Sequence, residues 1–251
     1  MTAPIKLNFV IDEDHLITHT LTHILPSEKT QEDIRALRNK AGKISPNGYN
    51  YLQKQFIYPG IYTWEDQEAQ DLIATLKESV EFQVILDQTK TYQEKIEQEW
   101  DANLEKSFRF MQEMTALPLD NSYTVFVTHP SLPNGRYLGS KQIAWGGPPK
   151  FENHNTVYLW HEVLHDHENL GTDDNTGHAI IELLADNNLR VHLNGENLEK
   201  LMGHASLNRI RSAIYADDWQ QYIASSEKDI LKFKTEMKEK YKTFAKIVDN
   251  P

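Results

Sequence analysis

A stretch without glycine or proline dominates the first half of the chain. Neither residue occurs from Ile61 to Leu117, where Glu, Lys, Gln and Ala prevail and apolar residues recur three or four positions apart. These residue types favour helix, and the spacing gathers the apolar side chains on one helix face. The stretch therefore predicts two long amphipathic helices, with the polar run at 87–91 as the break between them.

The rest of the chain combines short strands with further helices. Strands are expected at 5–11, 122–129 and 136–145, which are rich in alternating β-branched and aromatic residues. Helical spacing recurs at 15–25, 30–40, 49–55, 156–170, 176–193, 206–215 and 226–248. The expected fold class is α+β, dominated by helices, with a small mixed or antiparallel sheet.

The sequence changes character at Pro118. Residues 1–118 read as a mostly helical N-terminal part to which no function can be assigned. Residues 119–251 hold two of the three expected strands and most of the histidines. We therefore expect two parts that meet near this proline, as separate units or packed as one.

Composition excludes several classes of function. There is no cysteine, so disulfides, thiolate metal sites and cysteine nucleophiles are ruled out. The formal net charge of −11 disfavours nucleic acid and anionic membranes as partners. No apolar run is long enough to span a bilayer, and the N-terminus lacks the apolar core of a signal peptide. We expect a cytoplasmic protein.

Histidine is distributed unevenly along the chain. Seven of the 11 histidines lie between positions 154 and 204. They are His154, His161, His165, His167, His178, His192 and His204. Such clustering points to a metal site or an acid–base centre.

The densest histidine pair has a recognisable spacing. Residues 161–165 read His-Glu-Val-Leu-His on an expected helix. Residues four apart share a helix face, so His161 and His165 project together and Glu162 lies beside them. Two neutral imidazoles can hold Zn²⁺, and the carboxylate can accept a proton from a water molecule. The alternative is a polar helix face that carries two histidines by chance.

The next expected helix supplies candidates for a third ligand. His178, Glu182 and Asp186 recur every four residues on a helix that is otherwise apolar. Buried carboxylates need a partner such as a metal ion. Glu182 is thus the expected third ligand, and Asp186 an acceptor for the N–H of a ligand imidazole. The metzincin pattern is absent, because it needs glycine at 168 and histidine at 171, where the chain has Glu168 and Gly171.

The two motifs together resemble the gluzincin branch of zinc metallopeptidases, the thermolysin-like superfamily. The likeness spans about residues 120–190, with a gap between the motifs a few residues shorter than in familiar members. It implies that His161, His165 and Glu182 bind zinc, that Glu162 is the general base, and that Asp186 supports a ligand histidine. The family also places an antiparallel edge strand beside the catalytic helix, where a peptide substrate adds as a further strand; 136–145 has the matching position in the chain.

Two further groups of residues are candidates. Gluzincins use a downstream Tyr or His to stabilise the oxyanion, which implies Tyr215 or His204 here; each is otherwise a surface or packing residue. His15, His19 and His23 form a second stripe with a four-residue period, which suggests either a second metal site or a structural helix face.

The expected function is therefore that of a zinc-dependent hydrolase, a metallopeptidase with one Zn²⁺ per chain and a peptide or protein substrate. The alternative is a non-catalytic, zincin-like metal-binding protein that acts as an interaction or regulatory module. A fourth protein ligand, such as Asp186 or His178, would favour that alternative. The sequence leaves the substrate and the oligomeric state open.

Overall fold

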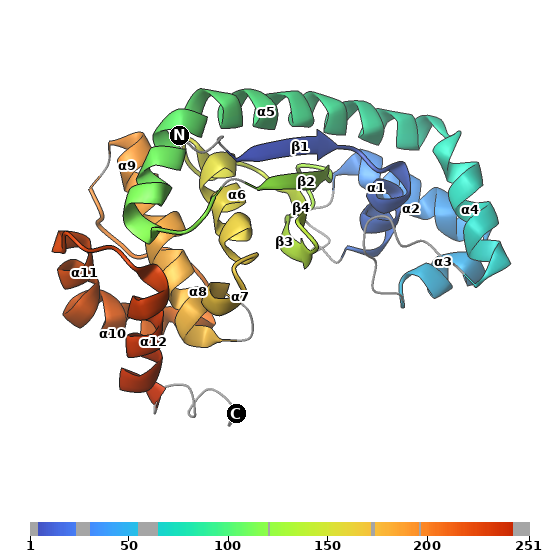
Figure 1. The fold of residues 1–251 in the computed structure, drawn as a ribbon. Coiled ribbons are helices and arrows are strands. Elements are labelled where there is room, and N and C mark those ends of the chain that lie inside the picture. The colour runs from blue at the N-terminus through green and yellow to red at the C-terminus, as the bar shows by residue number, and fades with distance from the viewer. Residues whose placement is uncertain are drawn as a thin grey trace.

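The computed structural model describes residues 5–23, 31–54, 65–119, 121–171, 174–195 and 197–242. Their fold is α+β, dominated by helices around a small four-stranded mixed sheet, as expected (Figure 1). In Figure 1 the long helix α5 (Val80–Thr115) runs along one side of the sheet, α1–α4 lie at one end and α8–α12 at the other. No helix within these ranges is both long and apolar enough to cross a membrane.

The N-terminal helices are α1 (Glu13–Thr22), α2 (Glu32–Ile44), α3 (Pro46–Leu52) and α4 (Gln67–Lys77). The second half contains α6 (His154–Leu164), α7 (Glu168–Gly171), α8 (Asn175–Ile181), α9 (Arg190–Asn194), α10 (Asn208–Ile214), α11 (Gln220–Ala224) and α12 (Ile230–Lys240). Two π-helical segments, η2 (Glu182–Leu189) and η4 (Tyr215–Trp219), and a 3₁₀ turn, η3 (Ala205–Leu207), connect some of these helices.

The sheet is ordered β1 (Lys6–Val10), β2 (Ser122–Val127), β4 (Gln142–Gly146) and β3 (Asn134–Gly139). The first three run parallel, and β3 is antiparallel to β4 at the edge. The single strand expected at 136–145 is wrong, because the segment folds as a hairpin. Ser140 and Lys141 at its tip both have positive φ, 49° and 59°, as the favoured two-residue hairpin turn requires.

The long stretch without glycine or proline does form two helices, but they meet elsewhere than expected. The chain breaks between α4 and α5 at Ser79, whose hydroxyl accepts a hydrogen bond from the Phe82 N–H at 3.2 Å. The predicted break at 87–91 is wrong, since α5 continues through it. Thr89 and Thr91 donate their hydroxyl protons to carbonyls one turn earlier, Ile85 and Asp87, and so fit inside the helix.

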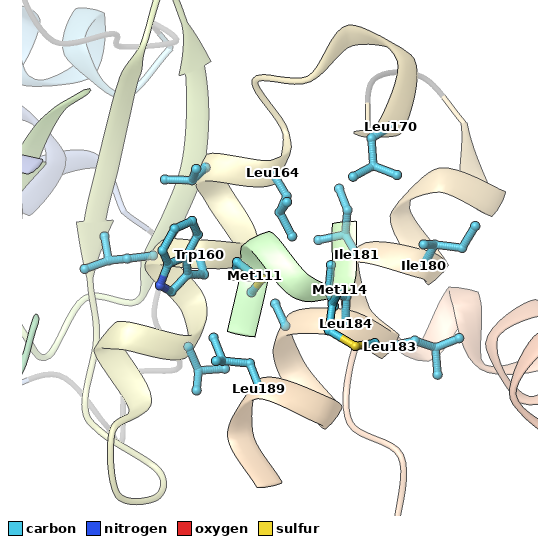
Figure 2. Close-up of a cluster of buried hydrophobic side chains, with 14 of the residues drawn as sticks. Met111, Met114, Trp160, Leu164, Leu170, Ile180, Ile181, Leu183, Leu184 and Leu189 are labelled. Atoms are coloured by element: carbon cyan, nitrogen blue, oxygen red, sulfur yellow. The ribbon is translucent and has the colours of Figure 1, made fainter. Parts of the chain in front are cut away.

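The apolar side chains form two clusters that α5 connects. The smaller cluster joins α1–α4 with the start of α5. The larger lies between the sheet, the second half of α5 and the helices after 154, and it takes residues from both sides of 118. Figure 2 shows part of it, with Met111 and Met114 of α5 beside Trp160 and Leu164 of α6. The strand β1 likewise pairs with β2 across the expected boundary.

The start of α6 is held by a side chain from another helix. Asn153, just before α6, has a φ of 59° and makes no side-chain cap. The carboxylate of Glu99 on α5 instead accepts hydrogen bonds from the Thr156 N–H at 2.8 Å and the Asn155 amide at 2.7 Å. A carboxylate at a helix N-terminus also suits the helix dipole. These contacts fix the helix that carries His161 and Glu162.

Candidate metal centre

Two histidine rings meet at the end of α6. His161 lies in the last turn and His165 immediately follows the helix. Their Nε2 atoms are 3.2 Å apart. Two nitrogens this close can bind the same zinc ion, because zinc–nitrogen bonds are about 2.0–2.1 Å long.

A third imidazole reaches the same point from α8. The ring centroid of His178 lies 5.2 Å from that of His161 and 4.9 Å from that of His165, and the latter two are 5.0 Å apart. A tetrahedral ion with metal–nitrogen bonds of about 2.1 Å holds imidazole centroids about 5 Å apart. The nitrogens of all three rings lie within 4.8 Å of one another, so the group can hold a metal ion.

The outer nitrogens of two of these rings have hydrogen-bond partners. Nδ1 of His161 lies 2.8 Å from Oδ1 of Asp186, and Nδ1 of His165 lies 3.1 Å from the carbonyl oxygen of Gly171. Such partners select the tautomer that leaves Nε2 free for a metal. Nε2 of His178 is buried and has no hydrogen-bond partner in the described part of the chain. A buried nitrogen of this kind needs one, and the residues present thus fit a metal ion.

The charges around the site favour a cation. Burial alone disfavours protonated His161, but the carboxylates of Asp186, Glu162 and Glu182 outweigh it and raise the pKa of this histidine to about 9. Burial and the neighbouring histidines lower the pKa of His165 to about 3 and that of His178 to about 4. The carboxylates therefore stabilise positive charge at this point, while the rings of His165 and His178 stay neutral.

Glu162 lies beside the three rings and is fixed by the edge strand. Its Oε2 accepts a hydrogen bond from the backbone N–H of Tyr137 on β3 at 2.7 Å. Burial raises the pKa of this carboxyl group, which is 7% exposed. Gly135 on the same strand leaves the space that Glu162 and Trp145 occupy, because a Cβ there would lie 2.9 Å from the Trp145 ring.

A pocket of about 810 Å³ opens onto His161 and Glu162. One wall comes from the start of β3 and the 146–148 segment after β4, and another from residues 200–205. The side chain of Asn187 on η2 holds that second wall through both the N–H and the carbonyl of Met202, at 2.7 and 3.0 Å. The Asn187 side chain thus anchors this second wall to η2.

Glu182, the expected third ligand, has other partners. Its fully buried carboxylate accepts hydrogen bonds from Arg211 Nη1, from the backbone N–H of His204 at 2.6 Å and from Nδ1 of His204 at 2.7 Å. It belongs to a second group that can hold a metal, with His178 and His204. The guanidinium of Arg211 already neutralises the carboxylate there. The structure thus groups His178, and not Glu182, with the two motif histidines.

The helix that carries both residues is less regular than the sequence predicts. The spacing predicts one regular helix over 176–193, whereas α8, η2 and α9 form a continuous helix whose middle has wider turns. A π-helix displaces side chains from the regular positions and often occurs at functional sites. In the sequence, His178 stands out only as a member of the predicted stripe. Regular spacing gives no reason to prefer it to Glu182 as the third metal ligand.

The candidates for oxyanion stabilisation differ in position. His204 lines the pocket, with its ring centroid 6.4 Å from that of His161 and 4.8 Å from that of His178. The hydrogen bond with Glu182 raises the pKa of His204, whose side chain is 62% exposed. Tyr215 begins η4, packs half-buried against the larger core and does not line the pocket.

The second histidine stripe lies apart from this centre. His15, His19 and His23 occupy α1 and its end, with neighbouring ring centroids 5.9 and 4.8 Å apart. In the described ranges these three do not form a group with all nitrogens at metal-binding distance. They contribute instead to the interior around α1, where burial lowers the pKa of His15 to about 4.

Comparison with protein-family models, with curated proteins and with solved structures finds no match to this chain. The gluzincin resemblance accordingly stays a prediction from the motifs. What can be argued about function comes from the geometry of the centre itself.

Proposed function

We propose that the chain is a zinc-dependent hydrolase, and specifically a metallopeptidase. The observation that carries this proposal is the convergence of three imidazoles, His161, His165 and His178, beside the buried carboxylate of Glu162. Three nitrogen ligands with a base next to them are typical of catalytic zinc sites. The proposal replaces Glu182 by His178 as the third ligand.

The number of ligands supports an enzyme over a structural zinc site. Structural sites have four protein ligands, whereas catalytic sites keep one position open. Among the described residues, the group around His161 has three members, and Asp186 is engaged with the far nitrogen of one of them. A bound Zn²⁺ would supply Lewis acidity, which polarises a carbonyl group and lowers the pKa of water.

Glu162 would act as the general base. The carboxylate accepts a proton from the attacking water and passes it to the leaving amine. The Tyr137 N–H occupies Oε2 and so orients the carboxylate. The remaining oxygen, Oε1, has no hydrogen-bond partner among the described residues and would take the proton.

His204 would stabilise the negative charge that develops on the carbonyl oxygen. Glu182 holds its Nδ1, and the opposite ring nitrogen is left for the pocket. The raised pKa keeps this ring a donor over a wider pH range. A donor fixed before the reaction stabilises the transition state more than mobile water does.

The surroundings of the centre suit a peptide. The pocket has a volume of about 810 Å³, and the start of the edge strand β3 forms part of its wall. Edge strands bind extended peptides through main-chain hydrogen bonds. The N–H of Tyr137 on this strand donates to Glu162, so a peptide bound beside β3 would lie close to the catalytic carboxylate.

The test combines metal analysis with hydrolysis. We expect about one equivalent of zinc per chain, cleavage of a quenched fluorescent peptide library, and loss of activity on removal of zinc. Glu162→Gln should keep the zinc and lower kcat by about 10²–10⁴-fold. The exposed Glu94→Gln on α5 is the matched control and should behave as wild type. Absence of stoichiometric metal, or unchanged activity in Glu162→Gln, would overturn the proposal.

A further inference from the structure

Two lysines are among the residues that line the pocket beside the candidate metal centre. Lys150 follows β4 and precedes α6, and Lys200 lies in the 200–205 segment that forms the second wall. Both side chains are exposed. In the described part of the chain, neither ammonium group has an ion pair with a carboxylate.

The other charges of the pocket are already committed. Asp186 is bonded to His161, and Glu162 to the Tyr137 N–H. The guanidinium of Arg211 is bonded to the buried carboxylate of Glu182. The two acids of the pocket, Glu162 and Asp186, are thus almost completely buried, whereas Lys150 and Lys200 are exposed.

This local positive charge contrasts with the rest of the protein. The chain has 37 acidic and 26 basic residues, so its overall field repels anions. At physiological ionic strength, distant charges are screened beyond about 8 Å. An anionic group in the outer part of the pocket would therefore respond mainly to nearby charges, and Lys150 and Lys200 are the exposed lysines among the residues that line it.

The pocket also has a large apolar surface that fixes how a ligand lies. Trp145 and Tyr158 stack with ring centroids 6.0 Å apart, and Leu201 and Met202 belong to the second wall. A small inorganic anion would leave this surface uncovered. A peptide carrying a carboxylate would both cover the apolar walls and pair with the lysines.

We propose that this pocket selects peptides with a carboxylate close to the bond that is cleaved, and that Lys150 and Lys200 recognise it. The inference rests on the proposed function, since it names the substrate class of the same site. The carboxylate has two sources, the side chain of an acidic residue or the C-terminus of the peptide. Both present the same group to an ammonium ion.

The experiment uses dipeptide hydroxamates as probes. The hydroxamate group binds zinc and so fixes the position of the peptide, independently of whether a peptide bond is cleaved. Four probes combine Glu or Gln as the first residue with a free or amidated C-terminus. Their Kd values for the zinc-loaded protein are measured by calorimetry at low and high salt.

We expect at least one carboxylate probe to bind about tenfold more tightly than its amide counterpart, as befits two exposed ion pairs. The preferred pair identifies the source of the carboxylate. The double variant Lys150→Gln/Lys200→Gln should lose the preference, high salt should weaken it, and the exposed Lys95→Gln on α5 should retain it.

Equal Kd values for all four probes, or a preference that survives in the double variant, would overturn the inference. No binding of any probe would overturn it as well. A clear preference together with no peptide hydrolysis by the wild type would instead overturn the proposed function and leave the carboxylate site established.

Discussion

Nδ1 of His161 lies 2.8 Å from Oδ1 of Asp186, and both side chains are almost completely buried. The hydrogen bond orients the ring so that Nε2 faces His165 and His178. It also connects α6 with η2, two elements that the chain forms 25 residues apart. Asp186 therefore orients a residue of the candidate metal centre without belonging to the group that could hold the ion.

The first prediction concerns this contact. Asp186→Ala should weaken zinc binding by about 10–100-fold, as loss of an outer partner of a ligand histidine does in other zinc sites. A competition titration against a chromophoric chelator measures the change. Asp101→Ala, on the exposed side of α5, is the matched control. An unchanged zinc affinity in Asp186→Ala would show that the orientation of His161 does not depend on this carboxylate.

The second prediction separates His178 from Glu182 as the third ligand. His178→Ala should lose stoichiometric zinc, as His161→Ala should. Glu182→Gln should keep the zinc but lose stability, because it leaves the guanidinium of Arg211, which is 1% exposed, without its carboxylate. Breaking a buried ion pair in this way costs about 3–5 kcal/mol.

Zinc content and urea denaturation, measured on the same preparations, report these two effects separately. If Glu182→Gln lost zinc while His178→Ala retained it, the ligand set expected from the sequence would hold and the one proposed from the structure would fail.

Some features of the fold and of the candidate site could be predicted from the sequence, and others could not. The α+β class followed from local patterns, because helical spacing and β-branched runs are properties of short segments. The position of the helix break depended on a single cap at Ser79 and on threonines that bond back to their own helix. Patterns of polarity do not distinguish such threonines from a break.

The hydrogen-bond partners of Glu182 could not be predicted from the sequence, for a different reason. Arg211 and His204 come from segments 29 and 22 residues away, and no local pattern connects them with η2. Motifs thus identified the helices that carry the site, and tertiary contacts decided which side chains meet.

The third prediction concerns the contact between α7 and α8. A Cβ at Gly177 would lie 1.7 Å from the carbonyl oxygen of Leu170. Gly177→Ala should therefore destabilise the protein, although alanine is usually about 1 kcal/mol better than glycine in a helix. Because α8 carries His178, zinc affinity should fall as well.

Gly42→Ala in α2 is the matched control for this substitution. Its Cβ would lie 3.7 Å from the Tyr49 ring, an ordinary contact, so we expect stabilisation of about 0.5–1 kcal/mol. Thermal unfolding of both variants measures the difference. Equal gains in stability at positions 42 and 177 would refute the close packing of α7 on α8.

The fourth prediction concerns the stability of the fold in acid. Burial lowers the pKa of His15 and of His129 to about 4, whereas an unfolded histidine titrates near 6.5. The folded state therefore holds both rings neutral, while the unfolded state binds protons below pH 6.5. The contribution of these two rings to stability is complete above that pH and falls as the pH drops from 6.5 to 4, by about 3 kcal/mol for each ring.

The contribution of His15 can be isolated by comparing variants. His15→Leu removes the titrating group from an interior position that is 3% exposed, so its free energy of unfolding should depend less on pH between 6.5 and 4 than that of the wild type. His192→Leu, at an exposed position, should change that dependence less. Urea denaturation at several pH values gives the slopes. Parallel curves for wild type and His15→Leu would mean that His15 titrates normally in the folded protein, and the interior around α1 would then have to admit a charged imidazole.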